Sequence, residues 1–362
     1  IAYRLTDKTV FRGGYGVSTI PFPDNSYAFN FPVLQNNAFN PANTYAAAGS
    51  LRMGFPVPLV ADIPQDGIIR NAPDNTYFVV PLDLKEAYLQ SWNVAFQRLL
   101  PGNFTFEAAY VGILGVAVLG RQNLHAAVAP GTGSAGQPLN RLFGRRSETT
   151  TWVPTNNNYN SLQVKLDRRF SDGFLLTTAY TYSRATDLSN DNAGFFNQID
   201  FRSNRGRADT DKTHVFVQSY IYEVPFGRRG RWLRSGVGSW IFGDWQLNGI
   251  FTAETGLPLN ITFSNTTLNA PGNNNRPNIS GKPEIYGGVG VGEKWLDVAA
   301  FSAPAPNTFG NVGRNVLSGP GLVNLDFSVF RKFPVTERYT LEFRMESFNF
   351  TNTPHFNNPN MT

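Results

Sequence analysis

The stretch LVNLDFSVFRKF at residues 322–333, followed by LEFRMES at 341–347, alternates apolar and polar side chains almost throughout. Such alternation indicates β-strands, because successive side chains of a strand point to opposite faces. One face of the predicted hairpin is apolar and carries Val323, Leu325, Phe327, Val329, Leu341, Phe343 and Met345. The other face carries Asp326, Ser328, Glu342, Arg344 and Glu346. The same pattern, followed along the rest of the chain, predicts the fold.

The same period of two recurs upstream and predicts about ten strands. They cover residues 1–5, 9–19, 86–98, 104–113, 159–170, 174–184, 212–226, 244–263, 321–333 and 338–350. Four connectors are compact and contain residues typical of tight turns: Asp7-Lys8, Pro101-Gly102, Asp172-Gly173 and Pro334–Glu337. Four others are long and rich in Asn, Pro, Gly and Ser: residues 20–85, 114–158, 185–211 and 264–320. Short and long connectors therefore alternate along the chain.

This alternation predicts an all-β fold, an antiparallel transmembrane β-barrel. Outer-membrane barrels combine short periplasmic turns with long extracellular loops, whereas loops beyond ~15 residues are uncommon in compact soluble domains. If the compact turns are periplasmic, successive strands must alternate in direction and each long loop must lie outside. This parity of the strand count requires residues 244–263 to be one strand, kinked at Gly256 and Pro258, and residues 227–243 to be a long periplasmic connector. It also predicts an incomplete barrel, in which strands 1–5 and 338–350 do not pair with each other.

Composition excludes several other classes of protein. The chain of 362 residues has no cysteine and three scattered histidines, which excludes disulfide frameworks, thiol nucleophiles and familiar zinc spacings. Its longest nearly apolar run, residues 108–119, is shorter than the ~20 residues of a spanning helix. The net charge of +5 is spread over separate Arg pairs, so no nucleic-acid partner is expected. We expect no enzymatic activity, no catalytic residues, no cofactor and no bound metal.

Nine short motifs give the sequence a family likeness. They are YNSLQV (159–164), YTYS (180–183), VPFG (224–227), WQL (245–247), WLD (295–297), FGNVGRNVLSGPG (309–321), NLDFS (324–328), FRMESFN (343–349) and NTPHF (352–356). In this order they resemble the C-terminal barrel region of Oar-like TonB-dependent outer-membrane receptors, which are common in Acidobacteria. The resemblance implies a barrel of about 22 strands around a plug. It also implies import of a bulky solute, such as a siderophore, oligosaccharide or peptide, driven by the inner-membrane TonB complex.

No plug, TonB box or terminal aromatic strand is visible in residues 1–362. The chain is therefore expected to form one partial barrel domain whose partners are outer-membrane lipid, the plug and the missing strands of the same receptor, and, through the plug, TonB. We expect it in the outer membrane of a Gram-negative bacterium. Two alternatives remain open: a passive porin-like channel, and a secreted β-rich adhesin or structural protein. Solubility without detergent would favour the adhesin.

The predicted barrel places individual residues in the lumen, against lipid or at the membrane interfaces. The charged face of the C-terminal hairpin would line the lumen and its apolar face would contact lipid. Candidates for the aromatic girdles at the membrane interfaces are Trp92, Tyr180, Tyr182, Tyr220, Tyr222, Trp240 and Trp245; ligand stacking is their alternative use. Val329→Arg is expected to cost roughly 2–4 kcal/mol if Val329 lies near the membrane midplane, and Ser328→Arg far less.

Charged residues in the last hairpin and in one long loop lead to two expectations. Pairing of unlike charges across the last hairpin predicts Asp326 directly opposite Arg344. The carboxylates in or beside residues 185–211 are either solvated or calcium ligands, since calcium prefers oxygen donors. They are Asp187, Asp191, Asp200, Asp209 and Asp211. Recognition of the solute is expected mainly in the long loops, which the barrel would hold in place.

Overall fold

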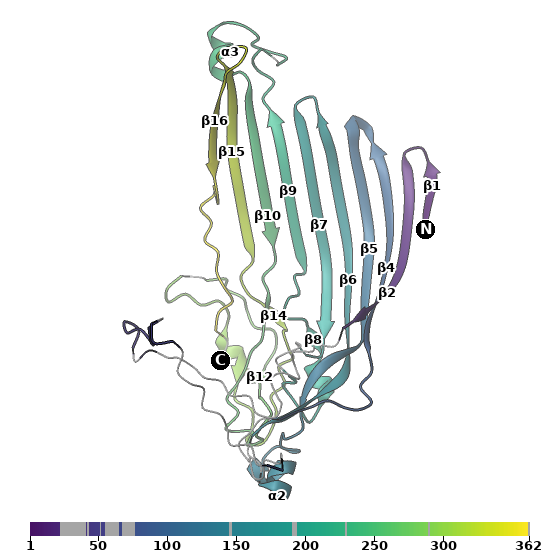
Figure 1. Ribbon diagram of the computed structural model, residues 1–362, viewed down its shortest axis with the longest axis vertical. Helices are drawn as coiled ribbons and strands as arrows, with labels where there is room; N and C mark the ends of the chain where they lie inside the picture. Colours follow the sequence, from purple (N-terminus) through teal and green to yellow (C-terminus); the bar gives the residue numbers. More distant parts are fainter. Residues whose placement is uncertain are drawn as a thin grey trace.

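The structure is a computed structural model that describes residues 1–21, 41, 43–50, 52–54, 65–66, 77–144, 147–189, 194–228, 230–288 and 290–360. Its main feature is an antiparallel sheet in which ten strands pair in chain order (Figure 1). They are β1 (Ala2–Thr6), β2 (Thr9–Ile20), β4 (Ala87–Leu100), β5 (Phe104–Asn123), β6 (Thr149–Ser171), β7 (Phe174–Asp187), β9 (His214–Glu223), β10 (Trp245–Glu254), β15 (Leu322–Pro334) and β16 (Thr340–Ser347). The predicted all-β fold of about ten antiparallel strands is confirmed.

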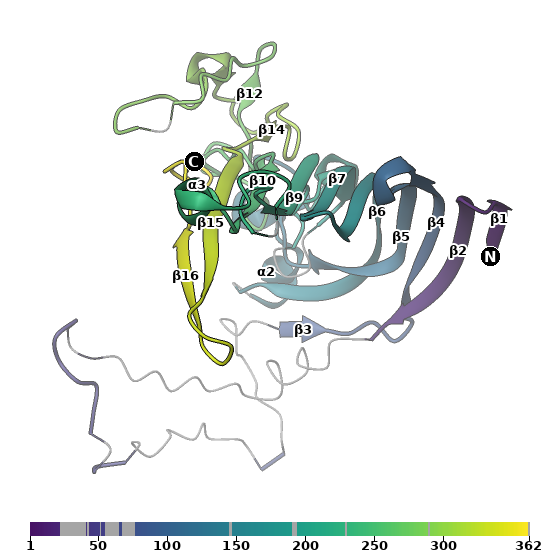
Figure 2. The ribbon, with the colours of Figure 1, turned by 90° about the horizontal axis from the view of Figure 1, so that it is seen from above.

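The sheet curves into an open arc (Figure 2). In the described part of the chain β1 pairs only with β2 and β16 only with β15, so these two strands form the edges. No ladder joins them, as the parity argument predicted. An open edge cannot lie in lipid, because each unpaired backbone group would cost several kcal/mol there. In a membrane, both edges would therefore need to be covered.

Short turns gather at one end of the strands and long connectors at the other (Figure 1). At the short-turn end, Asp172 and Gly173 join β6 to β7 with φ values of 50° and 75°, the left-handed conformation that tight hairpins with Asp-Gly turns require. The connector between β9 and β10 lies at the same end and contains α3 (Gly236–Phe242). No helix in the described ranges is long and apolar enough to cross a membrane.

Three predicted boundaries or pairings are wrong. β5 continues to Asn123 and β6 begins at Thr149, because a bulge between Gly115 and Val118 interrupts the alternation without ending the ladder. β10 ends at Glu254 instead of continuing to residue 263. At Gly256 the chain meets the 319–320 backbone so closely that a Cβ would lie 2.0 Å from the carbonyl oxygen of Gly319.

The third wrong prediction is the register of the last hairpin, in which Asp326 does not lie opposite Arg344. The ladder pairs Phe333 with Leu341, which brings Arg344 opposite Phe330. The guanidinium of Arg344 lies 5.1 Å from the centre of the Phe330 ring. Asp326 instead accepts hydrogen bonds from the side chain of Asn324 (3.0 Å) and the backbone of Asn349 (2.8 Å).

The described parts of the long connectors include a body of packed loops at the far end of the sheet, called the loop body here. Its described elements are β3 (Tyr77–Val79), η2 (Gly133–Gly136), α2 (Pro138–Phe143), η3 (Phe201–Asn204), β8 (Gly206–Arg207), β11 (Pro258–Leu259), β12 (Asn278–Ile279), η4 (Val298–Ala300), β13 (Phe301–Ser302) and β14 (Leu317–Ser318). A small apolar cluster of Ala127, Leu268 and Ala270 lies within it. Side chains that are fully buried there include the amides of Asn204, Asn275 and Asn315. The loop body thus has a largely polar interior.

Candidate functional site

The ladder sorts the side chains of β15 and β16 into two faces. Asp326, Ser328, Glu342, Arg344 and Glu346 fall on one face, because Ser328 pairs with Glu346 and the other members lie an even number of positions away. The same face continues onto β10, where the Asn248 side chain donates to Ser328 Oγ at 3.2 Å. Arg344 and Glu342 form an ion pair at 3.1 Å. The register therefore brings all five predicted lumen candidates onto one polar face.

The opposite face carries all seven apolar candidates of the C-terminal hairpin. Val329 pairs with Leu247 on one side and Met345 on the other. Several of these side chains are solvent-exposed: Leu341 is 63%, Val323 47% and Phe343 46% exposed. Apolar surface this extensive marks an interaction with lipid or protein. Within the C-terminal hairpin, Arg331 is the charged exception on this face, and it is only 7% exposed.

The aromatic candidates on strands share the apolar face but lie at two levels. Tyr222 pairs with Phe174 and Leu247 near the short turns, whereas Tyr182 pairs with His214 nearer the loop body. Phe174 and Tyr182 lie eight positions apart on β7, which is about 26 Å along a strand. Trp92 lies inside β4 and packs over Gly112, where a Cβ would be 2.3 Å from its ring.

The remaining candidates divide between the same two levels. Tyr180 is paired with Phe216 and its hydroxyl lies 2.8 Å from Nδ1 of His214. Tyr220 lies next to Gly249 on β10. Trp240 belongs to α3 and Trp245 begins β10, both at the short-turn end.

Arginines engage the loop carboxylates that sequence analysis left open between solvent and calcium. Arg314 forms ion pairs with Asp187 and Asp209. Arg207 donates from Nε to Asp211 at 2.7 Å, and the Asp211 side chain is 0% exposed. Asp200 accepts from the backbone N–H of Arg202 at 3.0 Å and is the N-cap residue of η3. Asp191 lies outside the described residues.

These ion pairs fasten loops that are far apart in sequence. Asn315 donates from its side chain to the carbonyl oxygen of Arg207 (2.7 Å) and to Asp209 (2.6 Å). Arg207 also reaches Ser318 Oγ at 2.7 Å. Arg314 and Asn315 belong to the 309–321 motif that carries the sequence resemblance. That motif therefore has a structural task, since it joins the third long connector to the fourth.

Arg276 brings a further positive charge into the loop body. Its guanidinium lies 4.1 Å from the centre of the Phe196 ring and donates to Asn260 at 3.2 Å. Burial, together with the nearby positive charge of Arg314, lowers the pKa of Arg276 to about 10. Arg276 stays protonated at neutral pH, so the loop interior contains a cation that is only partly compensated.

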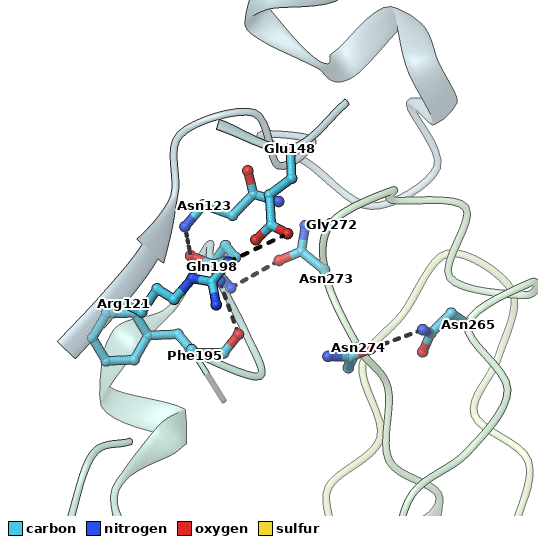
Figure 3. A pocket seen from close by; sticks show the side chains of 10 residues that line it. Arg121, Asn123, Glu148, Phe195, Gln198, Asn265, Gly272, Asn273 and Asn274 are labelled. Carbon is cyan, nitrogen blue, oxygen red and sulfur yellow. Dashed lines mark hydrogen bonds and ion pairs between the residues drawn. The ribbon is translucent and has the colours of Figure 1, made fainter. Parts of the chain in front are cut away.

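A polar cavity of about 290 Å³ opens where the ends of β5 and β6 meet the loop body (Figure 3). Arg121 and Glu148 lie on its strand side, 4.0 Å apart. Gln198 lies between the walls: it accepts from the backbone of Asn123 at 3.1 Å, and its own backbone donates to Asn273 at 2.9 Å. A guanidinium, a carboxylate and several amides thus line one hollow, which suits a ligand with many polar groups.

Sequence reasoning missed this cavity and the arginine network. The Arg207–Asp211 pair had a local signal, because its members are four positions apart. The cavity walls come from residues 121–123, 148, 194–198 and 265–274, all within segments predicted as long loops without strands of their own. α3 was also missed, since its sequence GVGSWIF contains two glycines that disfavour a helix.

The match to a protein family agrees with this architecture. The model of a family described as an outer membrane beta barrel domain matches residues 1–362. No curated protein matches the chain. Among solved structures, the ferric-catecholate import receptor Fiu of Escherichia coli K12 is similar at 12% identity and a TM-score of 0.44, over 97% of this chain and 30% of that one.

Two further solved structures are similar to a comparable extent. The ferripyoverdine receptor of the Pseudomonas aeruginosa outer membrane matches at 8% identity and a TM-score of 0.43, over 97% of this chain and 28% of that one. BauA, the ferric preacinetobactin receptor of Acinetobacter baumannii, matches at 10% identity and a TM-score of 0.42, over 99% of this chain and 33% of that one. The chain spans a third or less of the length of each of these proteins. The family match covers the whole chain, and the chain therefore belongs to the family of outer membrane beta barrel domains, in the outer membrane of a Gram-negative bacterium.

Proposed function

We propose that this chain forms part of the barrel wall of a TonB-dependent receptor and that its loop body helps to bind an imported solute. The observation that carries the proposal is the ordered polar body at one end of the sheet, fastened by Arg314 and Asn315 of the motif that resembles Oar-like receptors. In this arrangement the polar face of the sheet lines the lumen and the apolar face contacts lipid. The plug and TonB act from outside this chain.

The solute class proposed here is a bulky polar molecule, such as a ferric siderophore, an oligosaccharide or a peptide. The cavity between Arg121, Glu148 and Gln198 supplies charged and amide groups for such a molecule. The ferric siderophores named for the similar solved structures provide the first probes.

Uptake by cells tests this function. The full-length receptor is expressed in a Gram-negative host with and without TonB, and accumulation of a radioiron-labelled ferric catecholate, a labelled maltooligosaccharide and a labelled peptide is measured. We expect receptor-dependent uptake of one probe that falls to background without TonB. Uptake that persists unchanged without TonB would instead establish the passive channel.

Arg121→Ala should weaken binding of the transported probe. A hydrogen bond to a charged group contributes about 1.5–3 kcal/mol, so we expect the apparent Kd to rise roughly ten- to a hundredfold. Arg205→Ala is the matched control, because Arg205 is exposed in the same loop body and does not line the cavity. Equal effects of the two variants in a cell-surface binding titration would contradict a role for the cavity.

A further inference from the structure

The connector between β9 and β10 is far longer than its hairpin requires. Two residues suffice to join antiparallel strands, and β6 and β7 are joined in that way by Asp172 and Gly173. Residues 224–228 and 230–244 instead form a folded unit, called the α3 unit here, that contains α3. The unit is internally bonded, since Trp232 and Pro225 are linked at 3.1 Å and Phe226 and Asp244 at 2.9 Å through their backbones.

Six large apolar side chains of this unit are exposed. We call them the α3 patch: Trp232, Leu233, Val237, Trp240, Ile241 and Phe242. Val237 is 73% exposed, Trp240 70% and Trp232 59%. A cluster of this kind, with two tryptophans, is unfavourable in water and marks a surface that another phase or molecule covers.

The α3 patch is fixed to the apolar face of the sheet. Trp245 donates from its indole to the carbonyl oxygen of Ile241 at 2.9 Å. Arg331 donates to the carbonyl oxygens of Ile241 and Trp240, at 3.0 and 2.5 Å. Since Arg331 and Trp245 are cross-strand partners on the apolar face, the last turn of α3 lies on that side. The positive charge also suits the C-terminal end of a helix.

A set of arginines accompanies the α3 patch. Arg228, Arg231 and Arg234 are exposed, and the sequence from 224 to 244 contains four arginines and a single acidic residue, Asp244. Arg234 also donates from Nε to the carbonyl oxygen of Gly230 at 3.0 Å, which fixes the base of its side chain. The unit therefore combines apolar side chains with unbalanced positive charge, the composition of segments that lie in an anionic membrane interface.

We propose that the α3 unit is an interfacial anchor that binds anionic phospholipid in the periplasmic leaflet of the outer membrane. The α3 patch enters the boundary between headgroups and acyl chains, and Arg228, Arg231 and Arg234 contact the phosphates. Two observations select lipid as the occupant: the patch is continuous with the apolar face through Trp245 and Arg331, and its charge is complementary to an anionic surface. The inference rests on membership of the outer-membrane family and on the apolar face contacting lipid, and does not require solute uptake.

Lipid selectivity provides the first test. The full-length receptor is reconstituted in nanodiscs of phosphatidylcholine alone or of equal parts phosphatidylcholine and phosphatidylglycerol, and the retained lipid is identified by native mass spectrometry. We expect retention of phosphatidylglycerol. The combined variant Arg228→Gln, Arg231→Gln and Arg234→Gln should weaken it by roughly fivefold per arginine, about a hundredfold in all.

Two matched variants separate charge from folding. Arg141→Gln, Arg202→Gln and Arg205→Gln together remove three exposed arginines from the loop body and should leave retention unchanged. The corresponding Lys variants of Arg228, Arg231 and Arg234 keep the charge and should retain the lipid. Equal retention by the Gln variant and the wild-type receptor, or no preference for phosphatidylglycerol in the wild type, would overturn the proposal.

Depth of insertion provides the second test. Acyl chains brominated near the headgroup should quench the emission of Trp240, so that Trp240→Phe lowers the quenchable part of the fluorescence. Trp152→Phe should not, because Trp152 lies beside Phe78 at the loop end and is only 5% exposed. Quenching of Trp240 by acrylamide but not by brominated lipid would overturn the proposal and favour a periplasmic protein as the occupant.

Discussion

Asp211→Ala is expected to release the loop body from the end of the sheet at a cost of about 3–5 kcal/mol. The Asp211 side chain is 0% exposed and that of Arg207 8%. Without the carboxylate, Arg207 becomes a buried charge without its counter-ion, and the backbone N–H of Ala185 loses its acceptor at 2.6 Å. Hydrogen exchange measured by mass spectrometry should show protection around residues 185–211 falling at least a hundredfold.

Two variants control this result. Asp7→Ala breaks the Arg4–Asp7 pair at the short-turn end, whose side chains are 66% and 92% exposed, and should cost at most about 1 kcal/mol. Arg207→Met combined with Asp211→Leu removes both charges and should recover much of the stability. If Asp211→Ala changed protection no more than Asp7→Ala, the loop body would not depend on this pair.

The strands were predictable because their physical signal is local. A period of two along the chain, with Asp-Gly or Pro-Gly between runs, is enough to predict antiparallel neighbours and their facing. The signal failed where the ladder bulges, since Gly115 and the left-handed Ala117 (φ 55°) shift the register and the alternation stops. It failed again at Gly256, where the approach of the 319–320 backbone ends β10.

The register of the last hairpin shows which force dominates when two compete. Charge pairing favoured Asp326 opposite Arg344, but such pairs contribute only some tenths of a kcal/mol. The turn decides instead: Thr336 Oγ1 accepts from the backbones of Arg338 (3.2 Å) and Tyr339 (3.1 Å). This turn needs the five residues 335–339, and its length sets the pairing of Phe333 with Leu341.

The loop body could not be predicted, because its contacts are not local. Arg314 lies more than a hundred positions from both Asp187 and Asp209, and nothing in the spacing of these residues indicates that they meet. The motif at 309–321 identified the segment but not its partners. The cavity depends on the same long-range packing, since Gln198 connects β5 to the 273 loop.

Leu325→Arg should be the most damaging substitution on the apolar face, at about 2–4 kcal/mol, because the cost of arginine on a lipid-facing strand is greatest at the membrane midplane. Arg331 marks the level of the interface on this strand, because it hydrogen-bonds to α3. Leu325 lies six positions away on β15, which is ~20 Å along the strand and ~15 Å in depth at a tilt of about 40°.

Depth and facing are tested separately by two companion variants. Val329 is only two positions from Arg331, so Val329→Arg can extend its charge to the interface and should cost about 0–1 kcal/mol. Val329 therefore lies nearer to the interface than the midplane position for which the cost of roughly 2–4 kcal/mol was expected. Asn324→Arg is adjacent to Leu325 but on the polar face, near Asp326, and should be tolerated. Guanidinium unfolding of the receptor in lipid should therefore rank Leu325→Arg well above the other two; equal losses for Leu325→Arg and Asn324→Arg would mean that the apolar face does not contact lipid.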